Sequence, residues 1–142
     1  MTQIIIREFQ FPDDYPAIYD LWEHAGSGIQ LRRSDEPDEI QKKLQRDPDL
    51  FLVAEESGKI IGAVMGGFDG RRGMMYHLAV DESRRHQGIG TMLMENLETR
   101  LREKGCIRYY LMVLKDNQES IHFYKTHGCE PMDLIVFGKN IS

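Results

Sequence analysis

Residues 77–91 read HLAVDESRRHQGIGT, and they decide how the rest of the chain is interpreted. The stretch joins a β-rich segment, residues 74–80, to a segment whose apolar residues recur at three- and four-residue steps. Gly88 and Gly90 stand where that helix begins. A helix N-terminus carries unpaired N–H groups and about half a positive charge, and glycines let a ligand approach the backbone closely. The stretch therefore indicates a phosphate-bearing ligand, with an ordinary tight turn as the alternative.

Two other phosphate-binding patterns fit this stretch poorly. The dinucleotide fingerprint needs a third glycine where Leu93 stands, and an acid after the next strand, where Lys115 follows Leu114. The nucleoside-triphosphate loop needs the sequence Gly-Lys-Ser/Thr, which the chain does not contain. We therefore disfavour both classes of site.

Working outward, the residues before this stretch predict one strand, two helices and a meander. Residues 3–9 are β-rich, and a helix opened at Pro12 and Asp13–Asp14 runs to the Gly26–Gly28 segment. Residues 29–36 are irregular, and residues 37–46 predict a short polar helix. Three strands joined by turns then follow, at residues 50–55, 60–68 and 74–80.

The residues after the stretch predict alternating helices and strands. The long helix that begins at Gly88 ends at Lys104–Gly105. A strand over 107–114, a helix over 117–126 and a strand over 134–137 complete the chain. We expect one α/β (α+β) domain over residues 1–142, with the order β-α-α-β-β-β-α-β-α-β. Strands 74–80 and 107–114 should be parallel, because a helix crosses between them.

Composition limits the function. The chain has 142 residues, and its 23 acidic and 18 basic side chains give a net charge of −5, which disfavours nucleic-acid binding. No apolar run approaches the roughly 20 residues of a membrane span, and the N-terminus lacks a signal-peptide pattern. We therefore expect a cytoplasmic protein without membrane association, whose Cys106 and Cys129 are reduced.

Two motifs resemble those of the GNAT (GCN5-related N-acetyltransferase) superfamily. Its acetyl-CoA-binding pattern, Gln/Arg-x-x-Gly-x-Gly/Ala, is matched by Arg85, Gly88 and Gly90. Its later pattern, Asn-x-x-Ala/Ser-x-x-Phe-Tyr-x-x-x-Gly-Phe, is matched by Asn117, Ser120, Phe123, Tyr124 and Gly128, with Cys129 in the final aromatic place. Residues 49–80 also resemble small stand-alone bacterial members called YpeA-like, at FLVAE (51–55) and VMGGFDG (64–70). The element order matches too, so the resemblance covers nearly the whole chain.

The resemblance implies a fold and a reaction. The GNAT fold is a mixed, mostly antiparallel sheet of six to seven strands flanked by four helices. The implied enzyme is an N-acetyltransferase that moves an acetyl group from acetyl-CoA directly to a primary amine of a small molecule or protein, without a metal. A non-catalytic acyl-CoA-binding or sensing domain is the alternative. A homodimer is possible, as in other members.

The resemblance also implies residue roles. Backbone amides of Gln87, Gly88, Gly90 and Thr91 would hold the pyrophosphate, and Tyr124 would protonate the departing thiolate. Main-chain groups of Leu78 and Val80 would bind the pantetheine arm, as Asn117 would from its helix. The implied cosubstrate-binding set is Leu78, Ala79, Val80, Arg85, His86, Gln87, Gly88, Ile89, Gly90, Thr91, Asn117, Ser120 and Phe123.

The general base and the acceptor site are left open. Many GNAT members place a carboxylate on the strand before the phosphate loop, but this strand reads Met-Met-Tyr-His at residues 74–77. The candidate bases are His77, which we assign to the catalytic set, and Glu55 or Tyr76 acting through water.

The acceptor site is expected across the sheet from the cosubstrate, built from residues 26–36, the first two helices and the last strand, with Trp22, Arg32 and Arg33 as substrate residues. The two arginines would bind a carboxylate or phosphate, and a solvated loop is the alternative.

Overall fold

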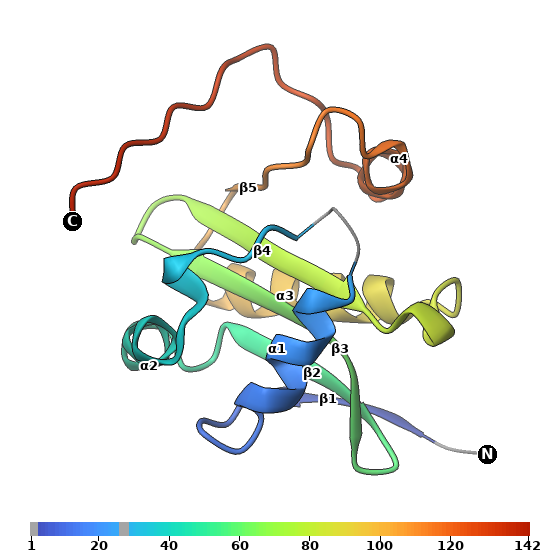
Figure 1. Ribbon diagram of the computed structural model, residues 1–142. Coiled ribbons are helices and arrows are strands. Elements are labelled where there is room, and N and C mark those ends of the chain that lie inside the picture. Colours follow the sequence, from blue (N-terminus) through green and yellow to red (C-terminus); the bar gives the residue numbers. More distant parts are fainter. Residues whose placement is uncertain (1–2, 26–28) are drawn as a thin grey trace. The chain divides into compact units, whose positions relative to one another are not determined.

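The computed structural model describes residues 3–25 and 29–142. The chain forms two compact units, Met1–Met112 and Val113–Ser142. The first unit contains a five-stranded sheet in the order β1-β2-β3-β4-β5 (Figure 1). The helix end expected at Gly26–Gly28 lies outside the described residues, and the single domain expected over 1–142 stays a prediction.

The sheet confirms the expected meander and the parallel crossover. Strands β1 to β4 pair antiparallel in chain order, and β5 joins β4 in parallel, with Gly73 opposite Tyr109 and Met74 opposite Tyr110. The strands are β1 (Ile4–Glu8), β2 (Phe51–Glu56), β3 (Lys59–Phe68), β4 (Gly73–Val80) and β5 (Tyr109–Tyr110).

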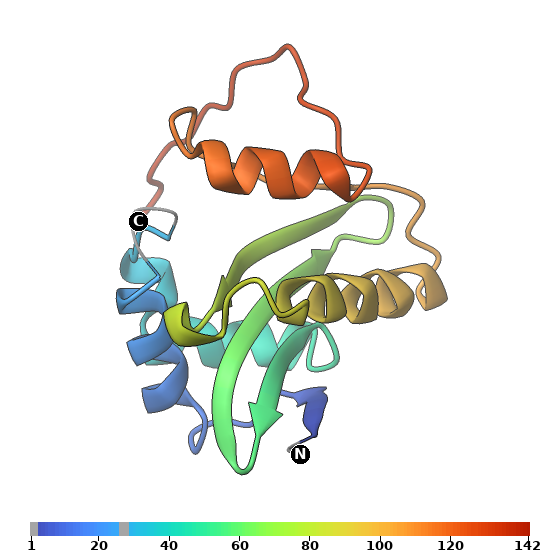
Figure 2. The same ribbon diagram turned by 90° about the vertical axis from the view of Figure 1, so that its right-hand side faces the viewer.

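Helices cover both faces of this sheet. Helices α1 and α2 lie on one face, and α3 lies on the other (Figures 1 and 2). The α-helices among the described residues are α1 (Tyr15–Glu23), α2 (Pro37–Arg46), α3 (Ile89–Glu103) and α4 (Gln118–Thr126), the last in the second unit. Short 3₁₀ turns are η2 (Arg33–Asp35) and η3 (Glu82–Arg84). None of these helices has the length and apolarity needed to cross a membrane.

Glycines on β3 let α3 lie close to the sheet. A Cβ added at Gly66 would lie 2.6 Å from Leu97 Cδ1, and one at Gly62 would lie 3.0 Å from Leu93 Cδ1. On the opposite face, Trp22 of α1 stacks on Phe51 of β2 at a ring distance of 6.1 Å. Both faces of the central strands β2 and β3 are therefore buried.

The strand count is lower than expected. The described residues form five strands rather than six to seven, because residues 134–137 form none, and the strand expected over 107–114 is present but shortened to Tyr109–Tyr110. β-branched and aromatic residues favour a strand only where a neighbouring strand pairs with them. Residue composition alone therefore predicted too long a strand over 107–114 and a strand over 134–137 that the structure does not contain.

A charged network joins β1, β2 and the start of α1. Arg7 donates from Nη1 and Nη2 to the two oxygens of Asp14, at 2.7 and 3.0 Å, and from Nε to Glu55 Oε2 at 2.6 Å. The hydrogen bond from Arg7 is the main reason that the pKa of Asp14 lies below its ordinary value. The Asp14 side chain is only 11% exposed, whereas Arg7 is 31% exposed, so the network is only partly shielded from solvent.

We expect Asp14→Asn to lower the free energy of unfolding by about 2 kcal/mol at neutral pH, since a charge-assisted bidentate bond is lost. A depressed carboxyl pKa stabilises the fold above the unfolded-state pKa of about 3.9, and this stability is lost as the pH falls through the folded-state pKa. The difference between the variant and the wild type should therefore shrink in acid. Urea unfolding at neutral pH and in acid checks this, with Asp20→Asn, whose side chain is 74% exposed, as the control. An equal difference at both pH values would contradict it.

Candidate functional site

Strand β4 contains a bulge at His77. Ala63 and Met65 of β3 are two residues apart, whereas their partners Ala79 and Tyr76 are three apart, so β4 holds one extra residue. His77 has a backbone φ of +48°, in the left-handed region. Histidine tolerates this region better than most residues, but the conformation still costs of order 1–3 kcal/mol. Such strain is typical of functional sites.

The bulge brings two successive side chains to the same face of the sheet. Tyr76 is opposite Met65, which packs in the core beneath α1 and α2. The His77 ring meets Trp22 of α1 edge to face, at a ring distance of 5.0 Å. In a regular strand these neighbours would point to opposite faces.

Asp35 is the direct partner of His77. Asp35 Oδ1 lies 2.8 Å from His77 Nε2, and Asp35 is only 5% exposed. Asp35 Oδ2 accepts a bond from the Arg32 backbone N–H at 3.0 Å, and the Tyr15 hydroxyl donates to the Asp35 carbonyl at 2.8 Å. Sequence reasoning missed Asp35, because no local pattern links residues 42 positions apart.

The other two base candidates have different surroundings. Glu55 accepts the 2.6 Å bond from Arg7 Nε within the charged network of β1 and β2. Tyr76 is 38% exposed, and burial of the rest of its ring raises the pKa of its hydroxyl. Of the three side-chain types, an imidazole has the ordinary pKa closest to neutral, so it is the one best suited to accept and release a proton near pH 7.

Most of the outer edge of β4 is not paired with β5. The two strands share only the Gly73 and Met74 pairs, and the Gly73 N–H donates to Arg108 O at 3.0 Å. The Asp81 N–H points the other way, to Ile61 O of β3 at 2.8 Å. Because backbone groups alternate along a strand, Leu78 and Val80 direct theirs away from β3.

The edge leads to the N-terminus of α3. Gly88 caps the helix with φ +82°, and a Cβ built there would meet nothing within 4 Å. His86, Gln87 and Gly88 are exposed, whereas Ile89 is buried. An exposed helix N-terminus with open space at its glycine cap is suited to an anion.

In the second unit, Asn117 and Ser120 cap α4. Asn117 Oδ1 accepts from the Ser120 N–H at 3.2 Å, which leaves the amide nitrogen of Asn117 as the group suited to bind a ligand. Phe123 meets Tyr124 edge to face at 5.3 Å. Burial, with a smaller contribution from Cys129, raises the pKa of Tyr124 to about 12. The phenol therefore keeps its proton at neutral pH.

Comparison with known proteins decides the family. The acetyltransferase (GNAT) family profile matches residues 15–129. An acetyltransferase of Pectobacterium atrosepticum is 43% identical over 137 residues, which cover 96% of this chain and 94% of that protein. The chain belongs to the GNAT acetyltransferase family. It is thus an acyl-CoA-dependent N-acetyltransferase, with acetyl-CoA as its cosubstrate.

Other GNAT relatives agree. A Yersinia enterocolitica acetyltransferase is 42% identical over 96% of this chain and 94% of its own length. The crystal structure of Ard1 from Thermoplasma volcanium superposes with a TM-score of 0.77 at 28% identity, covering 88% of this chain and 81% of that one. The PaiA N-acetyltransferase of Thermoplasma acidophilum, solved with coenzyme A, has the same fold, with a TM-score of 0.79 at 20% identity over 94% and 93% of the chains.

The remaining residues expected in the GNAT site have partners within the protein. Arg85 Nη2 donates to the Ala25 carbonyl at 3.3 Å, and the adjacent Arg84, which is not among the expected residues, pairs with Glu56. Trp22 is 1% exposed, so it packs against His77 from within the core. Arg32 is exposed and bonds Gln30. Arg85 keeps its positive charge, because its partner is a neutral carbonyl, and it adds to the partial charge of the α3 N-terminus.

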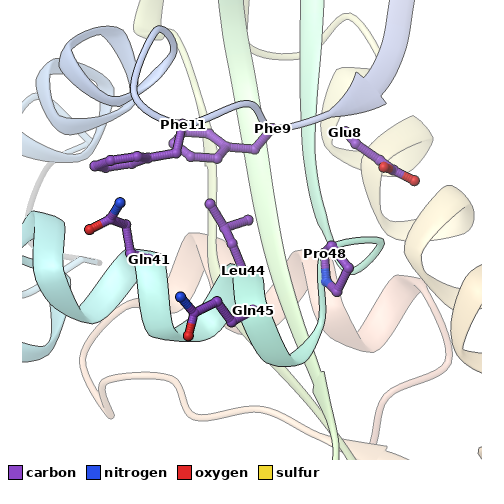
Figure 3. A pocket seen from close by; sticks show the side chains of 7 residues that line it. All are labelled: Glu8, Phe9, Phe11, Gln41, Leu44, Gln45 and Pro48. Atoms are coloured by element: carbon purple, nitrogen blue, oxygen red, sulfur yellow. The ribbon is translucent and has the colours of Figure 1, made fainter.

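The described residues also include a hollow and two cysteines. A hollow of about 350 Å³ is lined by residues of β1, the β1–α1 connection and α2 rather than by the β4 bulge (Figure 3). Cys106 and Cys129 are half-buried, and their reduced state stays a prediction. Within the described part of the chain, no three side chains gather as metal ligands would.

Proposed function

We propose that this acetyltransferase transfers the acetyl group directly from acetyl-CoA to a primary amine, with its chemistry at the β4 bulge. The observation that carries this proposal is the β4 edge at Leu78 and Val80, which β5 leaves unpaired and which runs to the exposed α3 N-terminus. The pantetheine arm would pair with that edge as an added strand does. The amides of Gln87, Gly88, Gly90 and Thr91 would hold the pyrophosphate.

His77 would act as the general base. A primary amine with a pKa near 10.4 is only about 0.04% neutral at pH 7, so a proton must be removed before the nitrogen can attack. An imidazole has the right intrinsic basicity for that task near neutral pH. His77 is half-buried and held by Asp35 and Trp22, which supports a fixed position for its ring.

Tyr124 would stabilise the departing thiolate by donating a hydrogen bond. A phenol with a pKa of about 12 holds its proton more tightly than a thiol with a pKa near 8.5. Complete proton transfer from Tyr124 to sulfur would therefore be uphill. A retained O–H donor still lowers the energy of the developing negative charge.

We expect Tyr124→Phe to lower kcat about tenfold, because one donor to the leaving sulfur is lost. The apparent affinity for acetyl-CoA should change less than twofold, since the phenol is not proposed to contact the pyrophosphate. Steady-state kinetics with acetyl-CoA varied at saturating amine checks this. Unchanged kcat would remove Tyr124 from the mechanism.

The acceptor would approach along residues 29–36, where Arg32 and Arg33 are exposed. Guanidinium groups there would favour an amine that also carries a carboxylate or phosphate. Trp22 would contribute indirectly, by supporting His77.

The experiment that tests the function starts with thermal shifts. Acetyl-CoA and CoA should each raise the melting temperature, whereas NAD and ATP should not. An acceptor panel of polyamines, amino acids, aminoglycosides, peptides and protein lysines then follows, with free CoA as the readout. Turnover without preference for acidic acceptors would remove Arg32 and Arg33 from the site. Binding without turnover on any amine would instead indicate a non-catalytic acyl-CoA sensor.

A further inference from the structure

We propose that Asp35 is a positioning residue that sets the tautomer of His77, so that Nδ1 is the atom that takes the proton from the amine. This inference rests on the proposed role of His77 as general base. The bond that carries it joins Asp35 Oδ1 and His77 Nε2 at 2.8 Å.

The chemistry of the pair selects one tautomer. A carboxylate oxygen has no proton to give, so His77 Nε2 must donate the shared hydrogen. A neutral imidazole carries one N–H, which leaves Nδ1 with a bare lone pair. In the opposite tautomer, Nδ1 would carry hydrogen and Nε2 would face Asp35 with its lone pair. That form would have no lone pair on Nδ1 with which to take a proton.

The reaction balances around this atom. A proton leaves the ammonium for His77 Nδ1, and the freed nitrogen lone pair forms the N–C bond at the thioester carbonyl. The C–S bond breaks, its electron pair stays on sulfur, and the second amine proton passes to solvent water as the amide forms. The imidazolium returns its proton to solvent or to the thiolate. Asp35 exchanges no proton, and its charge stabilises the imidazolium while it exists.

Both members of the pair are held in place from elsewhere. The second carboxylate oxygen of Asp35 accepts the Arg32 N–H, and the Asp35 carbonyl accepts the Tyr15 hydroxyl. The His77 backbone is set by the bulge, and its ring packs against the buried Trp22. A buried carboxylate with both oxygens bonded has little freedom to rotate. The tautomer preference is therefore built into the fold.

The substitution Asp35→Asn tests this directly. The amide oxygen can keep the bond from the Arg32 N–H, which turns the amide NH₂ toward His77 Nε2. Nε2 must then accept, so the imidazole hydrogen moves to Nδ1. We expect kcat to fall about 100-fold, while the affinity for acetyl-CoA changes less than twofold.

Nitrogen-15 NMR supplies a readout that a merely structural role would not move. Long-range ¹H–¹⁵N correlation distinguishes protonated from bare ring nitrogens, and the His77 signals among the 5 histidines are assigned by their loss in His77→Asn. The wild type should show hydrogen on Nε2, and Asp35→Asn should show it on Nδ1. The matched control is Asp47→Asn, which alters another buried acid, 6% exposed and bonded to Lys43 at 2.8 Å. That control should leave kcat and the His77 tautomer unchanged.

Each outcome decides the matter. The proposal is overturned if the wild type carries hydrogen on Nδ1, if Asp35→Asn keeps kcat within twofold, or if kcat falls while the tautomer stays the same. If His77→Asn retains full activity, the proposed base is wrong. The NMR comparison would in that case still report whether Asp35 sets the tautomer, so the two failures are distinguishable.

Discussion

Gly90→Glu is expected to weaken acetyl-CoA binding at least 100-fold without destabilising the fold. Gly90 is the second residue of α3, and a carboxylate there would occupy the position where the helix N-terminus is proposed to meet the pyrophosphate. A loss of about 3 kcal/mol, from a filled site and like-charge repulsion, corresponds to that factor. Glutamate favours a helix more than glycine does and suits a first turn, so the melting temperature of the free protein should not fall.

Thermal shift and isothermal titration with acetyl-CoA check this expectation. Gly90→Ala is the matched control, because the GNAT pattern accepts alanine at this place and a methyl group adds no charge. The control should bind acetyl-CoA within fivefold of the wild type. If Gly90→Glu bound acetyl-CoA as well as the control does, the pyrophosphate could not dock at the start of α3. The placement of the cosubstrate would then have to be abandoned.

His77→Asn is expected to lower kcat by about 10²- to 10³-fold and to leave acetyl-CoA affinity unchanged. Asparagine tolerates the left-handed backbone of the bulge, so the variant should fold, but its amide cannot accept a proton near pH 7. The loss should be largest at low pH, where less of the amine is neutral, and smaller at high pH. Measurements of kcat at several pH values with saturating substrates check the direction.

Two further variants test the rival bases. Tyr76→Phe removes the half-exposed hydroxyl on the same face of the sheet, and Glu55→Gln removes the carboxylate bonded to Arg7. Both should keep kcat within threefold of the wild type, although Glu55→Gln should unfold more easily. A large loss in either variant, with His77→Asn active, would move the base to that residue.

The sequence predicted most of the fold and only part of the site. Hydrophobic periodicity and turn residues placed the helices and the meander, and the glycine pair located the start of α3. Those features are local, so composition and spacing report them. The β4 bulge is not local, because it depends on how Ala63 and Met65 pair with Ala79 and Tyr76. The partnership of Asp35 with His77 likewise arises only when η2 and β4 meet in space.

The strand expected at residues 134–137 fails for a related reason. Leu134, Ile135, Val136 and Phe137 have strong β-propensity, but propensity describes how well a residue fits a sheet rather than whether a sheet edge is available. Trp22 shows the opposite limit. Its spacing placed it correctly on the apolar stripe of α1. Only the structure shows that it packs against His77, the candidate base, from within the core.

The part of the β4 edge that β5 leaves unpaired also affects how the purified protein behaves. An unpaired strand edge is a template on which another chain can add a strand, and this is a common start of aggregation. If the pantetheine arm occupies that edge, the cosubstrate protects the protein from self-association as well as supplying the acetyl group. Protein purified without acetyl-CoA should therefore aggregate more readily on storage than protein kept with it.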